Sequence, residues 1–284
     1  MSSHVLRTAL VSLAVTSALT SALAGCSSGD EEPEPTPTST ATSIAPTPPP
    51  TAAPPPKAPT KGACYRLTYR EVLAPTSATP PSKCDGSHTS ETYAIGTLDT
   101  VVDGHLLAVD SDRVQDQVAT ACPAALLDFL GGDPAALRLS MFRPLWFTPT
   151  VAQSDKGANW YRCDVVAVAG DKELAKPGTT LKGALAKPEL RDRFAMCGTA
   201  APDSEDFERV ICSAEHKWRA IEVIPVDAKT YPGVTALRDR LESPCEDAGL
   251  DAAADPLDYK WGYEYPTKEQ WAMGQTWGLC WAPD

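Results

Sequence analysis

The chain lacks an excess of basic residues, and this absence limits its partners. Its 284 residues include 25 Lys and Arg against 37 Asp and Glu, for a formal net charge of −12. A surface of this charge is repelled by nucleic-acid phosphates and by anionic membrane surfaces. We therefore expect no nucleic acid among its partners and no direct docking of the folded part on a bilayer.

Known catalytic motifs are also missing. The sequence contains no Gly-x-Ser-x-Gly, no His-Glu-x-x-His and no phosphate-binding glycine loop. Asp85, Ser87 and His88 have the residue types of a catalytic triad, but adjacent side chains on a strand point to opposite faces and cannot form the required hydrogen bonds. We predict no catalytic residues and no cofactor. A cell-wall hydrolase is the competing class.

The sequence has no long uninterrupted apolar run. The longest candidate, residues 9–23, contains Ser and Thr and is shorter than the roughly 20 residues of a membrane-spanning helix. Arg7 before it and small residues after it are typical of an export signal over residues 1–25. The signal ends in Leu-Ala-Gly-Cys26, which resembles the lipobox of bacterial lipoproteins.

The lipobox resemblance implies a lipid anchor. The signal would be cut before Cys26, and this cysteine would carry diacylglycerol. At about 0.8 kcal/mol per buried methylene, two acyl chains hold a protein stably on a membrane. We therefore expect the protein at the extracytoplasmic face of the cell membrane. An ordinary secretory signal followed by an unrelated cysteine is the alternative.

Residues 26–61 lack the side chains needed for a core. The stretch is rich in Pro, Thr, Ser and Ala, has no aromatic residue before Tyr65, and has Ile44 as its only large aliphatic side chain. Such a composition cannot bury enough apolar surface to fold. We predict a disordered linker that lifts the folded part off the membrane.

The rest of the chain contains an internal repeat. Residues 149–163 align without gaps on residues 266–280, with six identical positions where chance gives about one. The matched pairs are Pro149 and Pro266, Thr150 and Thr267, Gln153 and Gln270, Gly157 and Gly274, Trp160 and Trp277, and Cys163 and Cys280. We predict two copies of one unit, at 62–169 and 193–284, joined by a linker at 170–192.

Apolar spacing predicts the same elements in both copies. Residues eight and four positions before Cys122 and before Cys245 are apolar, which places each cysteine on the buried face of a helix. We expect helices at 111–131, interrupted or restarted at Pro123, and at 233–248. We expect strands at 64–72, 89–98, 137–147, 161–169, 194–197, 209–212, 218–226, 259–265 and 277–281. Each copy is then an α+β unit with one helix on an antiparallel sheet.

Four cysteines in each copy indicate disulfides in an oxidising compartment. They are Cys64, Cys84, Cys122 and Cys163 in the first copy and Cys197, Cys212, Cys245 and Cys280 in the second. Four cysteines allow three pairings, and the sequence does not choose among them. Our hypothesis joins the first cysteine to the second and the helix cysteine to the last strand. Each bridge would contribute roughly 2–4 kcal/mol.

A histidine follows the second cysteine of each copy by four residues. His88 and His216 have the spacing of a zinc ligand pair with Cys84 and Cys212. Disulfide use of the cysteines is the favoured interpretation, so we predict no metal. The histidines are then hydrogen-bonded framework residues, with ligand binding as the alternative.

These residues resemble the septum formation-related domain of envelope proteins from high-GC Gram-positive bacteria. Gly62, Cys64, Cys84, His88 and Glu91 follow the order of that family. The second copy has Ala195 in place of the Gly and Arg219 in place of the Glu. The resemblance covers residue 62 to the end and implies a connection to cell division, with an envelope protein, a divisome protein or a cell-wall glycan as partner.

The last strands are rich in aromatic side chains. Trp261, Tyr263 and Tyr265 alternate, so they share one face of a strand. The favoured interpretation is that they fill the core of a small sheet, and a binding platform for a glycan or a protein is the alternative. We predict a lipid-anchored envelope protein that acts as a binding or structural module.

Overall fold

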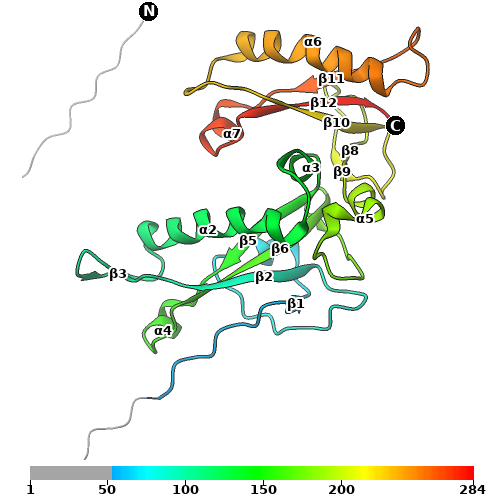
Figure 1. Cartoon of the computed structure of the whole chain (residues 1–284). Helices are drawn as coiled ribbons and strands as arrows, with labels where there is room; N and C mark the ends of the chain where they lie inside the picture. Colours follow the sequence, from blue (N-terminus) through cyan, green and yellow to red (C-terminus); the bar gives the residue numbers. More distant parts are fainter. Residues whose placement is uncertain (1–52) are drawn as a thin grey trace, which may run out of the picture. The chain divides into compact units, whose positions relative to one another are not determined.

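The computed structural model describes residues 53–284, which form one compact unit. Residues 53–60 contain no helix or strand. Two antiparallel sheets, each with a long helix on one face, make up the unit (Figure 1). The predicted α+β class is confirmed.

The first sheet has the strand order β1-β2-β6-β5, and β7 also pairs with β6. The long helix α2 connects β2 to the segment before β5, and a small hairpin of β3 and β4 precedes it. The bounds are β1 Cys64–Tyr65, β2 Ser90–Thr97, β3 Val101–Val102, β4 His105–Leu106, α2 Asp112–Leu130, β5 Phe142–Phe147, β6 Trp160–Gly170 and β7 Glu173–Leu174.

The second sheet has the order β11-β12-β10-β8-β9 and is covered by α6. Short helical segments join the two sheets and precede the last strand. The bounds are η1 (a 3₁₀ helix) Ala184–Ala186, α5 Pro188–Arg193, β8 Met196–Gly198, β9 Arg209–Ile211, β10 Trp218–Pro225, α6 Val234–Ala252, β11 Gly262–Glu264, α7 Lys268–Ala272 and β12 Trp277–Pro283.

The two sheets correspond strand by strand. Leaving out β7 and β9, the order β1-β2-β6-β5 in the first half matches β8-β10-β12-β11 in the second. The repeated Pro-Thr segment also begins a short helix in both halves, α4 (Val151–Ser154) and α7. Thr150 with Gln153, and Thr267 with Gln270, form reciprocal capping boxes there.

Helix α2 continues through Pro123. Its buried positions recur every four residues on both sides of the proline and end at Leu130: Val114, Val118, Cys122, Leu126 and Leu130. A proline inside a helix costs roughly 3 kcal/mol. Burying two leucines beyond it contributes about 1.5–3 kcal/mol each. Burial therefore outweighs the proline, and the interruption expected there does not occur.

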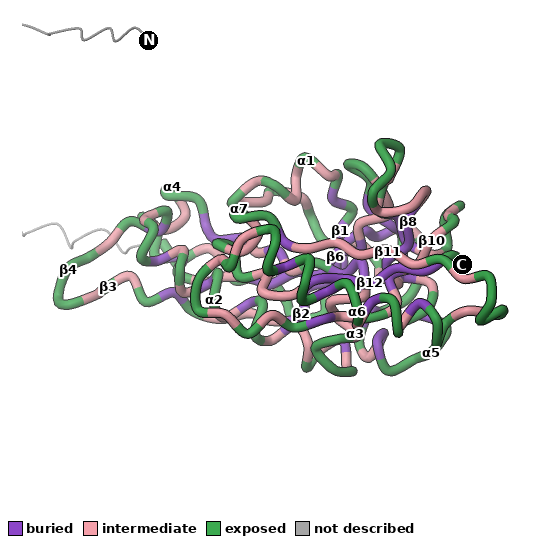
Figure 2. The backbone as a smooth tube through the Cα atoms, turned by 90° about the horizontal axis from the view of Figure 1, so that it is seen from above, coloured by how far each residue is buried: buried purple, intermediate pink, exposed green. Residues whose placement is uncertain are grey.

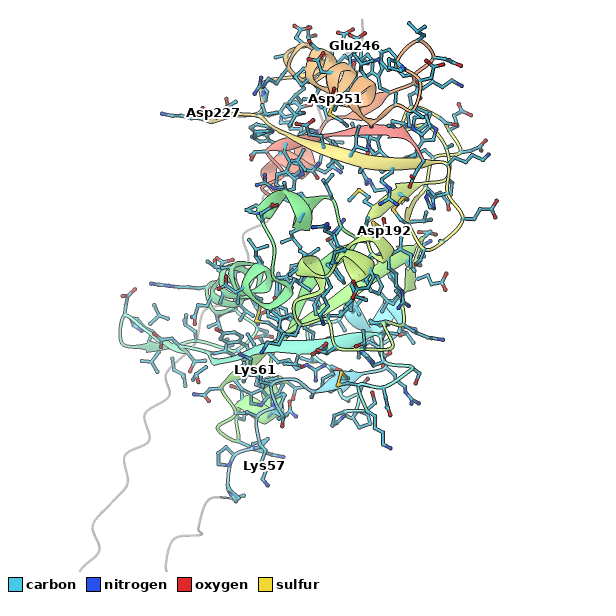
Figure 3. All side chains as sticks on the ribbon, turned by 45° about the vertical axis from the view of Figure 1, so that its right-hand side comes forward. Lys57, Lys61, Asp192, Asp227, Glu246 and Asp251 are labelled. Carbon is cyan, nitrogen blue, oxygen red and sulfur yellow. A yellow bond between two sulfur atoms is a disulfide. The ribbon has the colours of Figure 1, made fainter. Side chains whose placement is uncertain are left out.

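Four disulfides close the two halves separately, in the pairing favoured by our hypothesis. They join Cys64 to Cys84, Cys122 to Cys163, Cys197 to Cys212 and Cys245 to Cys280. In each half one bridge ties the long helix to the last strand. The other bridge joins the first strand to a cysteine farther along the chain, Cys84 in the first half and Cys212 in the second. Figure 3 shows the bridges within the folded unit.

One hydrophobic cluster spans both halves. It contains Tyr93 and Leu126 of the first half together with Ile211, Leu279 and Trp281 of the second. The backbone N–H of Met141 donates to the Phe194 carbonyl at 2.9 Å, and that of Met196 donates to the Leu139 carbonyl at 2.8 Å. Buried residues are concentrated along the strands (Figure 2), and the buried positions of α2 and α6 recur at helical spacing. The two halves therefore share a continuous core.

Two predicted strands are shorter than expected. The alternating segment 64–72 is a strand only at β1 and then turns into α1 (Tyr69–Val72), because Thr68 and Glu71 form a capping box. The segment 137–147 begins inside α3 (Pro134–Arg138). Asp133 caps α3, and Pro134 stands at its first turn. In both places local capping outweighs the alternating pattern.

The outer face of the first sheet carries a second small core with a buried ion pair. The side chains of Arg162 and Asp164 are 4% and 0% exposed, and their charged groups lie 3.2 Å apart. The Arg162 guanidinium lies 3.7 Å from the ring centre of Tyr65. Asp164 accepts hydrogen bonds from the hydroxyls of Ser90 at 3.1 Å and Thr92 at 2.6 Å. Burial raises the pKa of Asp164, and the charge of Arg162 opposes this effect.

Candidate functional site

His88 lies in the interior of the first half, directly before β2. Its exposed fraction is 0%, and neither ring nitrogen has a hydrogen-bond partner. Neighbouring Glu91 instead accepts hydrogen bonds from the Thr180 hydroxyl and the Leu181 N–H, each at 2.7 Å. Burial lowers the pKa of His88, and the negative charge of Glu91 opposes this effect. His88 therefore lies in a closed site, where the backbone of Thr179 also favours its charged form.

His216 occupies the corresponding position in the second half but is only half-buried. Its Nδ1 lies 2.7 Å from the Ala214 carbonyl, and its Nε2 lies 3.1 Å from Oδ2 of Asp284. Nε of Arg219 donates to the same Asp284 oxygen at 2.6 Å. Burial raises the pKa of Asp284, but hydrogen bonds from Arg219 and His216 outweigh this effect and lower it. Both nitrogens of His216 are therefore engaged.

The residue in place of the family's Glu has a different role in the second half. Arg219 binds Asp284 and also pairs with Asp192 of α5 at 2.9 Å. Figure 3 labels Asp192 on the segment that leads from the first sheet to the second. In the first half, the corresponding Glu91 holds the segment at Thr180 and Leu181. Glu91 and Arg219 therefore both contact the segment that connects the two sheets. The two histidines and these residues do not come together in one site.

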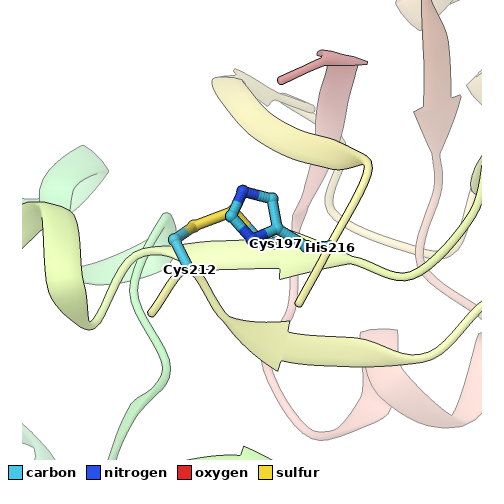
Figure 4. Close-up of side chains that lie close together, drawn as sticks. All are labelled: Cys197, Cys212 and His216. Carbon is cyan, nitrogen blue, oxygen red and sulfur yellow. A yellow bond between two sulfur atoms is a disulfide. The ribbon is translucent and has the colours of Figure 1, made fainter. Parts of the chain in front are cut away.

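Both histidines lie beside a disulfide. A ligand atom each from Cys64, His88 and Glu91 lies within 4.8 Å of the other two, and the same holds for Cys197, Cys212 and His216 (Figure 4). The cysteines of both groups are bonded in disulfides. A metal ion binds thiolate sulfur, which a disulfide does not offer. Cysteine ligands for a metal are therefore not available in either group.

The three predicted aromatic residues lie together at the edge of the second sheet. The ring centres of Trp261 and Tyr263 are 5.9 Å apart, and those of Tyr263 and Tyr265 are 6.4 Å apart. The guanidinium of Arg238 on α6 lies 5.8 Å from the Tyr265 ring centre. We call these four residues the aromatic ladder. It runs along β11, which pairs with β12 on one side and is the edge strand of its sheet.

The aromatic ladder belongs partly to the core and partly to the surface. All three rings are half-buried and pack against the small core of Ile224, Leu241, Cys245 and Cys280. The planes of Trp261 and Tyr263 differ by only 24°, so these rings stack on each other. The ladder is therefore neither a closed core nor an open platform, and Arg238 places a cation beside the Tyr265 ring.

A pocket of about 450 Å³ opens over this edge strand. Its lining consists of the ladder residues with Gly262, Glu264, and Pro202 and Asp203 from the loop between β8 and β9. A Cβ on Gly262 would lie 2.7 Å from Cγ of Pro202, so glycine allows the loop to approach the strand. The pocket lining combines aromatic carbon with two acidic residues and one arginine, so apolar and charged groups converge there as they do in small-molecule sites.

Sequence reasoning identified the aromatic residues of this pocket and missed the charged ones. Arg238 and Asp203 belong to a helix and a loop that the sequence separates widely from β11. Neither occurs in a motif, and only the fold brings them to the ladder. The single indication was Gly262, a glycine between two aromatic residues of a strand, which is typical of close approach by another backbone.

The predicted lipidation site Cys26, with the export signal and most of the linker, lies outside the described residues. Among residues 53–284, no helix is long and apolar enough to cross a membrane.

The fold and these sites define a disulfide-bonded α+β protein with a polar-aromatic pocket. Residues 141–280 match the family model described as septum formation. Over these residues the chain is similar to that family. The match begins just before β5 and leaves Cys64, Cys84, His88, Glu91 and Cys122 outside, so it is narrower than the resemblance from residue 62 onward. The comparisons with curated proteins and with solved structures found no match.

Proposed function

We propose that this protein is a binding module of the cell envelope that works in septum formation. In this proposal a lipid on Cys26 holds it at the outer face of the membrane, and residues 27–61 carry the folded unit away from the bilayer. The family match over residues 141–280 and the lipobox-like residues before Cys26 support this placement. The proposed ligand is a cell-wall glycan, with a protein of the division machinery as the alternative.

The observation that carries the proposal is the pocket over β11. Sugars combine apolar C–H faces with many hydroxyls, so they suit sites where aromatic carbon lies beside hydrogen-bonding groups. The aromatic ladder supplies aromatic carbon and tyrosine hydroxyls, and Asp203 supplies a carboxylate acceptor, whereas Glu264 is paired with Arg209. Arg238 adds a cation for the carboxylates of an anionic wall polymer.

Binding is proposed here in preference to hydrolysis because of the state of the histidines. His88 is inaccessible, and His216 has both ring nitrogens engaged by Ala214 and Asp284. A general base needs a free nitrogen within reach of the proton that it removes. Neither side chain meets this requirement.

We further propose that the two halves are copies of one ancestral unit. The corresponding strand orders, the capping boxes at Thr150 and Thr267 and the disulfide between helix and last strand in each half support this. In the first half the strand corresponding to β11 is β5, whose residues are Phe142 to Phe147. It has no aromatic ladder of the same pattern, so the proposed glycan site is specific to the second half.

The experiment is cosedimentation of the purified protein with insoluble peptidoglycan. We expect wild type to pellet and Arg238→Ala and Tyr265→Leu to remain largely in the supernatant. Arg240→Ala is the matched control, because Arg240 is also an exposed arginine of α6 but does not line the pocket. Equal pelleting of Arg238→Ala and wild type, or no pelleting of any variant, would contradict the proposed site.

The placement of the protein is tested separately in cells. A fluorescent fusion of the full chain is expected to gather at division sites, and Cys26→Ser is expected to release the protein from the membrane fraction. Uniform distribution along the envelope would contradict the septal role. Unchanged membrane association of Cys26→Ser would contradict the lipid anchor.

A further inference from the structure

A second and larger groove lies between the two halves. Its volume is about 640 Å³. One wall comes from α2, α3 and β5 of the first half, and the other from β12 and the segment before it, with Met196 of β8 between them. Leu126, Phe142, Met196 and Leu279 are buried at its base. Most of the lining residues are apolar, and the volume is in the range of small-molecule sites.

The charged residues of this groove are all cationic. They are Arg138, Arg143 and Arg209, and no carboxylate is part of the lining. This composition contrasts with the net charge of −12 of the whole chain. Arg209 is neutralised by Glu264, whose carboxylate oxygen lies 2.8 Å from its guanidinium. Within residues 53–284, no carboxylate lies within ion-pair distance of Arg138 or Arg143.

The structure holds these two arginines in place. The guanidinium of Arg138 lies 4.1 Å from the ring centre of Trp277, which is cation–π distance. Nη1 of Arg143 donates to the carbonyls of Ser140 at 2.9 Å and Phe142 at 2.6 Å. Two positioned guanidinium groups beside an apolar groove complement a ligand that has an anionic head and an apolar body.

The edge of β5 disfavours an extended peptide as the occupant. A peptide would add to this edge strand through backbone hydrogen bonds. Pro144 has no N–H to donate, and the Phe142 carbonyl already accepts from Arg143. The groove therefore offers apolar side chains and guanidinium groups rather than a backbone edge.

We propose that this groove binds a single-chain lipid with a phosphate headgroup. The chain lies along the apolar base, and the phosphate pairs with Arg138 and Arg143. Phosphate accepts several charge-assisted hydrogen bonds, and arginine donates them in pairs. The inference is independent of the aromatic ladder, which lines a different pocket.

Fluorescence titration of the full chain with palmitoyl lysophosphatidic acid, below its micelle concentration, tests the proposal. Trp277 lines the groove, so binding is expected to change the tryptophan emission, and Trp277→Phe is expected to remove most of this change. Arg138→Gln and Arg143→Gln are each expected to weaken binding roughly tenfold to a hundredfold, as loss of charged hydrogen bonds does. Arg240→Gln, an exposed arginine away from the groove, serves as control.

Two further ligands separate the head from the chain. Monopalmitoyl glycerol, which lacks the phosphate, is expected to bind at least tenfold more weakly, and inorganic phosphate is expected not to bind at millimolar concentration. Equal affinity for the neutral lipid would overturn the role of the arginines. Binding of phosphate alone, or binding of an acidic apolar peptide but no lipid, would overturn the proposed ligand class. Arg138→Gln keeps the test informative if Arg143→Gln fails to fold, because the Arg138 side chain packs on Trp277 whereas that of Arg143 hydrogen-bonds to backbone carbonyls.

Discussion

Replacing Arg162 with Met tests the buried ion pair of the first sheet. Met fills similar space against Tyr65 and Phe147, whose ring centres lie 3.7 and 4.5 Å from the guanidinium. It leaves the carboxylate of Asp164, which is 0% exposed, without an opposite charge. Removing one partner of a buried pair typically costs about 3–5 kcal/mol, so we expect a loss of unfolding free energy in this range.

A double variant separates charge from packing. In Arg162→Met with Asp164→Asn both charges are absent, and the Asn side chain can still bind the hydroxyls of Ser90 and Thr92. We expect the double variant to recover roughly 2 kcal/mol relative to Arg162→Met, because residues in contact are not additive. Urea unfolding at pH 7 with intact disulfides is measured for wild type, Arg162→Met, Asp164→Asn and the double variant. If the losses of unfolding free energy of the two single variants simply add in the double variant, the reasoning is refuted.

The pH dependence of Arg162→Met gives a second signature. Burial raises the pKa of Asp164 above the unfolded value of 3.8, and in this variant Arg162 no longer opposes it. The folded state then binds a proton at a higher pH than the unfolded state does. The unfolding free energy should therefore rise as the pH falls through the raised pKa toward 3.8. The double variant, which has no carboxyl group at this position, should lack this rise.

Two further predictions concern His88 and Gly249. Burial lowers the pKa of His88 below 6.5, so the unfolding free energy should fall as the pH drops from 6.5 toward the folded pKa, by at most about 1.4 kcal/mol per pH unit. His88→Gln should reduce this slope in urea unfolding and the exposed control His105→Gln should not; equal slopes would exclude His88 as the cause. Gly249→Ala should destabilise the protein by roughly 1–3 kcal/mol and alter tryptophan fluorescence, because its Cβ would lie 2.5 Å from that of Trp261. A stability gain, as helix propensity alone predicts, would show that the helix and β11 are not in tight contact.

Local patterns predicted much of the secondary structure. Strands β2, β6 and β10 and helix α6 were predicted to within a few residues. Helix α6 buries one face, so the required spacing of its apolar residues is visible in the sequence. Predictions were wrong where a short capping motif competed with alternation. At Thr68 a hydrogen-bonded cap began a helix inside a segment that alternates like a strand, and the helix capped by Asp133 extends into the start of the predicted strand 137–147.

The candidate site was only partly predictable. Trp261, Tyr263 and Tyr265 were found because residues two apart on a strand share a face. The stacking of Trp261 on Tyr263 could not be predicted, because the orientation of the rings depends on how α6 packs against them. Arg238 and Asp203 could not be found because they come from elements distant in the sequence.

The sequence by itself determined the α+β class, the repeated order of elements and the cysteines available for bridging, since these depend on residue type and spacing along the chain. Tertiary structure alone decided that His88 is enclosed while His216 is reachable, and that three arginines surround an apolar groove. These properties depend on which distant segments pack together. Which segments pack together depends on the total free energy of the folded chain, and no single segment determines this free energy.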